Sequence, residues 1–213
     1  MIVNERIVSY IHSLETTNSL LLDEMEKFAI DNYVPIIRKE MESFLRTMVT
    51  IKQPKRILEL GCAIGYSAIL MSEYMPKNCK IVTIENYDKR IPIAKEYIGR
   101  ADRGEDIELI FGDALEVMPT LEGSFDFVFM DAAKAQYINF LPHVLRLLDK
   151  GGILIADNVL QEGDLVESKF TVTRRNRTIH KRIREFLYEV KHSDELETSL
   201  VPIGDGITLS VKR

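Results

Sequence analysis

Two aspartates and an asparagine directly follow two apolar runs of the chain. Asp131 comes after the run 125–130, and Asp157 and Asn158 come after the run 152–156. If both runs are strands of an open α/β sheet, these side chains lie beyond the carboxyl ends of the strands, where such sheets bind ligands. Oxygen ligands without histidine or thiol suit Mg²⁺ or Mn²⁺. The pattern indicates a divalent-cation site, although Asp and Asn are also common turn residues after strands.

A lysine stands three residues after the first of these aspartates. A cation bound near Lys134 would lower the pKa of its ammonium group, because like charges disfavour the charged form. Lys134 and Asp131 are therefore candidate catalytic residues, with Lys134 as general base. A lysine that opens a helix is otherwise an ordinary solvated side chain.

A glycine turn follows the apolar run Ile57–Leu60. Gly61 ends that run, Gly65 follows four residues later, and a helical pattern begins at Tyr66. A strand, a glycine turn and a helix in this order present bare backbone amides next to a helix N-terminus, where a ligand can approach closely. The spacing Gly-x-x-x-Gly differs from the Gly-x-Gly-x-x-Gly of dinucleotide sites, so pyrophosphate binding is not favoured. A plain strand-to-helix turn remains the alternative.

Two further acids follow the next two expected strands. Glu85 ends the run 80–85 and is placed to accept hydrogen bonds from both hydroxyls of a ribose. Asp113, after the run 106–111, could accept from an adenine amino group or could cap the short helix that follows. Glu85 alone could equally be a solvated loop acid or a helix N-cap. The glycine turn, Glu85 and Asp113 in this order favour a bound nucleoside.

The strands and helices that position these residues are predicted by an alternation of β-type and helical patterns. We expect strands at 56–60, 80–85, 106–111, 125–130 and 151–157, and helices at 65–75, 88–100, 134–148 and 174–191. This repetition is typical of a parallel sheet covered on both faces. The runs 196–203 and 207–211, joined by Gly204-Asp205-Gly206, predict a hairpin whose last strand is antiparallel.

Three amphipathic helices are expected before the first strand. They are predicted at 2–15, at 20–32, and from Pro35 onward, with Pro35 in the first helical turn. These helices could cover the site, form a dimer face, or both. We expect one domain over 1–213, with a helical cap at 1–52 and a core at 53–213.

Composition limits the remaining classes of protein. The chain has 213 residues, 46% of them hydrophobic, and a formal net charge of -5, which suits one α/β domain with a full core. Cys62 and Cys79 form no Cys-x-x-Cys pair, so zinc and a disulfide framework are not favoured. No apolar run approaches a membrane span. We expect a soluble, cytoplasmic protein that does not bind membranes.

One segment is strongly basic in this acidic chain. Residues 174–184 contain six basic residues and no acid. On a helix, an apolar face would pack, and the opposite basic face would meet solvent or phosphates. The candidate RNA-binding residues are Arg174, Arg175, Arg177, Lys181 and Arg184.

Together these residues resemble the Mg²⁺-dependent O-methyltransferases of the catechol and caffeoyl-CoA type, which use S-adenosylmethionine. The likeness covers roughly residues 34 to 213. It is carried by Leu58–Ser67, Glu85, Gly112–Ala114, Asp131–Lys134 and Asp157–Leu160. It implies a Rossmann-like class I methyltransferase fold: a seven-stranded, mostly parallel sheet with an antiparallel C-terminal hairpin strand and extra N-terminal helices.

Within that family the sequence is most similar to bacterial tRNA 5-hydroxyuridine methyltransferases. The segments that carry this likeness are Val34–Ile36, Ala63–Ala68, Asp131–Tyr137 and Val201–Gly206. Cys62 stands where that subgroup usually has threonine, a small change that we expect to leave the turn unaltered.

The resemblance implies roles for the candidate residues. Residues that would hold S-adenosylmethionine are Gly61, Tyr66 and Ser67 at the methionine part, Glu85 at the ribose, Asp113 and Ala114 at the adenine, and Val34 and Asp131 along the pocket. Mg²⁺ would be held by Asp131, Asp157 and Asn158. Lys134 would lie by the acceptor hydroxyl.

The leading functional hypothesis is methylation of 5-hydroxyuridine at the wobble position of a tRNA anticodon stem-loop, by a homodimeric enzyme. The alternative within the same class is a small-molecule enzyme acting on catechol-like phenols. A third hypothesis, a nucleotide-binding oxidoreductase, is not favoured because the chain lacks the Gly-x-Gly-x-x-Gly motif of such enzymes. A non-catalytic RNA-binding module would not need the set Asp131, Lys134, Asp157 and Asn158.

Overall fold

The apolar runs of the chain form the strands of one mixed sheet. The computed structural model describes residues 2–213, and in this range seven strands lie in the order β3-β2-β1-β4-β5-β7-β6. Their bounds are β1 Arg56–Leu60, β2 Lys80–Glu85, β3 Ile107–Phe111, β4 Phe125–Met130, β5 Leu148–Ala156, β6 Leu196–Val201 and β7 Ile207–Lys212. Strands β1 to β5 pair in parallel, whereas β7 is antiparallel to both β5 and β6. The predicted fold class is confirmed.

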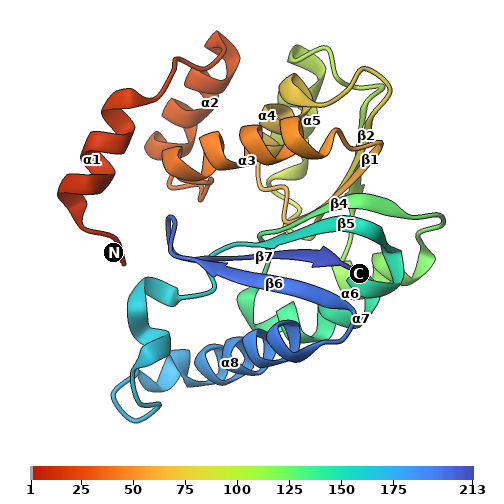
Figure 1. Ribbon diagram of the computed structural model, residues 1–213. Coiled ribbons are helices and arrows are strands. Elements are labelled where there is room, and N and C mark those ends of the chain that lie inside the picture. The colour runs from red at the N-terminus through yellow and green to blue at the C-terminus, as the bar shows by residue number, and fades with distance from the viewer. Residues whose placement is uncertain (1) are drawn as a thin grey trace.

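Helices cover both faces of this sheet (Figure 1). Their bounds are α1 Glu5–Leu14, α2 Leu20–Asp31, α3 Lys39–Lys52, α4 Tyr66–Tyr74, α5 Ile91–Arg100, α6 Ala114–Val117, α7 Tyr137–Leu147 and α8 Arg177–His192. Successive side chains of one strand point to opposite faces of the sheet and pack against different helix layers. Ile57 packs in the cluster under α2 to α5, whereas Leu58 packs in the cluster under α6 to α8.

The order of the strands reverses between β1 and β4. From β1 the chain first adds β2 and β3 on one side, and then returns to add β4 on the other side of β1. Backbone hydrogen bonds join the strand ends at this point. The Asp131 amide donates to the Leu60 carbonyl at 2.9 Å, and the Asp157 amide donates to the Met130 carbonyl at 3.0 Å. Parallel sheets of this kind bind ligands at such a switch point.

The structure corrects several predicted boundaries. The third helix begins at Lys39, not at Pro35; residues 34–38 belong to no helix or strand, and Ile37 among them is buried in the core. The predicted helix 134–148 is divided into a 3₁₀ turn, η2 (Lys134–Gln136), and α7. The predicted helix 174–191 begins with the 3₁₀ turn η4 (Arg174–Asn176), and α8 follows.

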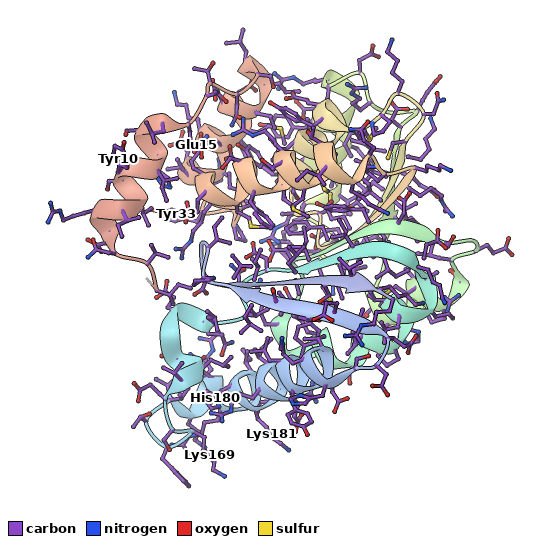
Figure 2. The ribbon with its side chains drawn as sticks, in the orientation of Figure 1. Tyr10, Glu15, Tyr33, Lys169, His180 and Lys181 are labelled. Atoms are coloured by element: carbon purple, nitrogen blue, oxygen red, sulfur yellow. The ribbon has the colours of Figure 1, made fainter. Side chains whose placement is uncertain are left out.

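Helix α1 lies outside the two layers and leaves apolar side chains in solvent. Ile7, Tyr10 and Leu14 recur at helical spacing and are all exposed; Figure 2 shows Tyr10 on the outer side of this helix. The predicted homodimer has a suitable surface here and stays a prediction. No helix within residues 2–213 is both long and apolar enough to cross a bilayer.

A buried tyrosine ties together the two strands that carry the aspartates. The Tyr137 side chain is fully buried. Its hydroxyl lies 2.9 Å from the Met130 carbonyl oxygen at the end of β4 and 3.0 Å from the Asp157 carbonyl oxygen after β5. This hydroxyl therefore fixes the spacing of the strand ends.

Replacing Tyr137 with phenylalanine should lower the free energy of unfolding by about 1–2 kcal/mol, because a buried hydrogen-bond donor is lost. Urea denaturation of Tyr137→Phe measures this change. Tyr10→Phe, at an exposed position, is the matched control and should unfold like the wild type. Equal midpoints for both variants would contradict the role given to the Tyr137 hydroxyl.

Candidate active site

A cavity of about 400 Å³ lies at the carboxyl ends of the strands. Ten of the predicted site residues line it: Gly61, Tyr66, Ser67, Glu85, Asp113, Ala114, Asp131, Lys134, Asp157 and Asn158. They come from the last residue of β2, from the loops and turns that follow the other four parallel strands, and from the starts of α4 and α6. The sheet thus brings together side chains that are far apart in sequence.

The glycine turn after β1 is shaped by a close approach of two backbones. Gly61 has φ +97°, and a Cβ at this position would lie 2.2 Å from the Asp131 carbonyl oxygen. Only glycine fits such a conformation and contact. Gly65, with φ +88°, caps α4, so that Tyr66 and Ser67 open the helix at the cavity.

Glu85 supports this turn with both carboxylate oxygens. One oxygen accepts a hydrogen bond from the Ala63 amide at 2.7 Å, and the other accepts from the Tyr87 amide at 2.8 Å. The side chain is buried but lines the cavity. Each carboxylate oxygen has a second acceptor site, so Glu85 can hold the turn and still accept from ribose hydroxyls.

Asp113 caps a helix and lines the cavity at once. Its carboxylate accepts from the Leu115 amide at 2.8 Å and caps α6, which confirms the capping role weighed from the sequence. Asp113 and Ala114 both line the cavity. A nucleobase there would meet the N-terminus of this short helix.

The candidate metal ligands lie at adjacent strand ends. Burial, and next the negative charge of Asp131, raises the pKa of Asp157 to about 7. Asn158 has a left-handed backbone (φ +55°), and its amide donates to Asp157 at 2.6 Å. No cluster of three His, Cys, Asp or Glu is found in residues 2–213; this set has two carboxylates and one amide oxygen. Two crowded carboxylates are a charge arrangement that a divalent cation would relieve, so the residues fit such an ion.

Lys134 forms an ion pair with the nearer aspartate. Its ammonium nitrogen lies 2.6 Å from Asp131 Oδ1, and both side chains are about one-quarter exposed. The 3₁₀ turn η2 places Lys134 at the cavity. Lys134 and Asp131 therefore share one side of the space in which an acceptor would lie.

The hairpin turn contributes a residue that the sequence analysis treated only as part of a turn. Asp205 accepts a hydrogen bond from the Glu162 amide through its carboxylate and from the Leu160 amide, at 3.0 Å, through its carbonyl. Gly206 accepts from the Val159 amide at 2.8 Å. These bonds fix the segment that directly follows Asn158. The aspartate inside Gly204-Asp205-Gly206 was visible in the sequence. Its role was not, because its partners, the amides of Leu160 and Glu162, lie far away along the chain.

Val34 does not line the cavity. It packs against the apolar cluster under α2 to α5, and the next four residues, Pro35 to Arg38, line the cavity instead. The predicted segment therefore lies at the pocket, and a contact between Val34 and the cofactor stays a prediction.

The predicted RNA-binding residues do not line the cavity. Arg174, Arg175, Arg177, Lys181 and Arg184 are all exposed. The guanidinium of Arg182, which was not singled out from the sequence, donates to the Ala135 carbonyl at 3.0 Å. This bond joins α8 to the turn that carries Lys134.

Glu59 is a buried acid of the site that the sequence analysis missed. It receives hydrogen bonds of 2.5 Å from the hydroxyls of Ser67 and Thr83. Burial raises its pKa to about 7, with smaller contributions from Asp131 and Glu85, and the two hydroxyls oppose the rise. The signal was a charged residue inside the apolar run Ile57–Leu60.

The sheet has a glycine turn after β1, the buried acid Glu85 at the end of β2, and a cavity at its switch point. Together these features define an enzyme that holds a nucleoside cofactor at its strand ends. A family model described as O-methyltransferase matches residues 12–213. The chain belongs to this O-methyltransferase family.

Individual relatives agree with this assignment. A putative caffeoyl-CoA O-methyltransferase of Arabidopsis thaliana is 31% identical over 196 residues, covering 89% of this chain and 84% of that protein. A catechol O-methyltransferase of Niastella koreensis is 35% identical over 132 residues, which span 60% of each protein. The SAH-bound structure of a Podospora anserina methyltransferase has a TM-score of 0.88 and 26% identity, covering 98% and 94% of the two chains. The protein is an O-methyltransferase that uses S-adenosylmethionine.

The pKa of Glu59 predicts how stability depends on pH. In the unfolded chain this group ionises near its ordinary value of 4.5, and in the folded protein near 7. Between these values the folded state keeps a proton that the unfolded state has lost, so stability falls as the pH rises through this window. The full effect is on the order of 3 kcal/mol.

Glu59→Gln should remove this contribution. The difference in unfolding free energy between the variant and the wild type should shift in favour of the variant as the pH rises from about 4.5 to about 7. Urea denaturation at several pH values in EDTA measures it, with the exposed Glu116→Gln as control. Parallel pH profiles for wild type and Glu59→Gln would contradict the buried, protonated state of Glu59.

Proposed function

We propose that this enzyme methylates the 5-hydroxyl of uridine at the tRNA wobble position and forms 5-methoxyuridine, with S-adenosylmethionine as donor and Mg²⁺ as metal. The observation that carries the proposal is the exposed basic segment 174–184, joined to the turn of Lys134 by the bond from Arg182 to the Ala135 carbonyl. A basic surface beside the acceptor space suits a polyanionic substrate. The likeness to tRNA 5-hydroxyuridine methyltransferases points the same way.

Methyl transfer needs an acceptor oxyanion in line with the methyl carbon. The acceptor hydroxyl loses its proton, the oxyanion attacks the methyl carbon, and the carbon–sulfur bond breaks. The electron pair stays on sulfur, so the products are a methyl ether and S-adenosylhomocysteine. Lys134 can accept the hydroxyl proton only as a free amine, and a hydrogen bond donated to Asp131 Oδ1, 2.6 Å away, would hold that amine in place.

A divalent cation fits Asp131, Asp157 and Asn158. When bound, it would lower the pKa of the acceptor hydroxyl and orient that oxygen. The chain's part is to hold the oxygen ligands at neighbouring strand ends and to keep them in place through Tyr137 and Asp205. Gly61, Tyr66, Ser67, Glu85, Asp113 and Ala114 would bind the donor along the other side of the cavity.

The second candidate is a small-molecule enzyme for catechol-like phenols. The relative described as a catechol O-methyltransferase favours it. A catechol offers two adjacent oxygens to a metal, and 5-hydroxyuracil offers the same pair through its hydroxyl and the carbonyl at C4. The ligand set at Asp131, Asp157 and Asn158 suits both substrates.

A direct comparison of the two substrates tests the proposal. Purified enzyme, S-adenosylmethionine and Mg²⁺ are incubated with an anticodon stem-loop RNA that carries 5-hydroxyuridine, and separately with catechol. Methylation of the RNA that stops in excess EDTA is the expected result, because the oxyanion needs the cation. Transfer to catechol alone would overturn the RNA proposal, and full activity in EDTA would overturn the metal.

A further inference from the structure

One aromatic side chain in the segment that follows β5 is held out in solvent. Phe170 is 74% exposed, and it lies in the loop between η3 (Gln161–Val166) and η4. Burying a phenylalanine is favourable, so displaying one costs stability. This loop begins just after the metal-ligand candidates Asp157 and Asn158.

The exposure of Phe170 is built into the loop. Leu165 and Val172 on either side are buried. The Ser168 carbonyl accepts from the Thr171 amide at 2.9 Å and from the Thr171 hydroxyl at 2.7 Å. The backbone around Phe170 is thus anchored on both sides while the ring points outward.

Helix α8 supports the same loop. The Arg177 guanidinium donates to the Val172 carbonyl at 3.3 Å and to the Phe170 carbonyl at 3.5 Å. His180, which is buried, contacts the Glu167 carbonyl at 3.2 Å. Two residues of helix α8 therefore hydrogen-bond to the backbone of this loop and hold it in place.

Basic residues cluster around Phe170 in the sequence. The Lys169 ammonium lies 5.1 Å from the centre of the Phe170 ring, and Arg174 and Arg175 are exposed in the adjacent turn η4. Between residues 166 and 184 there are seven basic residues and one acid, Glu167. Figure 2 shows Lys169 and Lys181 on the outer side of this region, away from the sheet.

A bare aromatic ring among cations is the combination that single-stranded nucleic acids bind: bases stack on the ring and phosphates meet the charges. We propose that Phe170 is a stacking platform for an unpaired base next to the methylated uridine, with Lys169, Arg174 and Arg175 on the flanking phosphates. This inference rests on the proposed function and names the contact that would select a loop of RNA over a free phenol. Unpaired bases of an anticodon loop are available for such stacking.

The test measures binding of an anticodon stem-loop RNA by fluorescence anisotropy at several salt concentrations. Phe170→Ala should weaken binding about tenfold at every salt concentration, because one stacked base is lost. Phe170→Trp should bind like the wild type. Val166→Ala removes another exposed apolar side chain, at the end of η3 four residues before Phe170, and should also bind like the wild type.

The charged residues should respond differently to salt. The double variant Arg174→Ala and Arg175→Ala should reduce the slope of log affinity against log salt by about 1.4, or roughly 0.7 for each lost phosphate contact on a single strand. Phe170→Ala should leave that slope unchanged.

Three results would overturn the platform. The first is wild-type RNA affinity in Phe170→Ala, and the second is an equal loss of RNA affinity in Val166→Ala and Phe170→Ala. The third is a changed sedimentation coefficient in Phe170→Ala, which would assign the ring to a contact between two copies of the chain. If the wild type methylates the RNA and Phe170→Ala still binds normally, only the stacking inference fails. If the wild type does not methylate the RNA, the proposed function itself fails.

Discussion

The site depends on two carboxylates that the sheet forces together. Asp131 and Asp157 follow neighbouring strands whose register is set by backbone pairing of β4 with β5. Burial of Asp157, and next the negative charge of Asp131, raises the pKa of Asp157 to about 7. Lys134 offsets part of that repulsion from the Asp131 side. A cation held between the strand ends would offset the rest.

Rigid surroundings keep this arrangement from relaxing. The Tyr137 hydroxyl spans the two strand ends, Gly61 lets the β1 turn press against the Asp131 backbone, and Asp205 holds the loop beyond Asn158. The same frame shapes the donor side of the cavity through Glu85 and Glu59. The donor site and the acceptor site are therefore parts of one hydrogen-bonded edge of the sheet.

Much of this edge could be predicted from the sequence, because polar residues that directly follow apolar strands must gather at one side of a parallel sheet. Gly61, Glu85, Asp131 and Asp157 were found in this way. Asp205 was not, since its partners lie in the loop after β5 and no local pattern reports a contact at that range. The helix start predicted at Pro35 was wrong, because proline suits both a first helical turn and a segment outside helices.

Binding of Mn²⁺, followed by electron paramagnetic resonance with S-adenosylhomocysteine present, shows whether the ends of β4 and β5 hold a cation. We expect one bound Mn²⁺ per wild-type chain and at least about tenfold weaker binding in Asp157→Asn. Asp31→Asn, which changes an exposed aspartate at the end of α2, should bind Mn²⁺ like the wild type. Equal Mn²⁺ affinity in Asp157→Asn and wild type would contradict a cation site at the ends of β4 and β5.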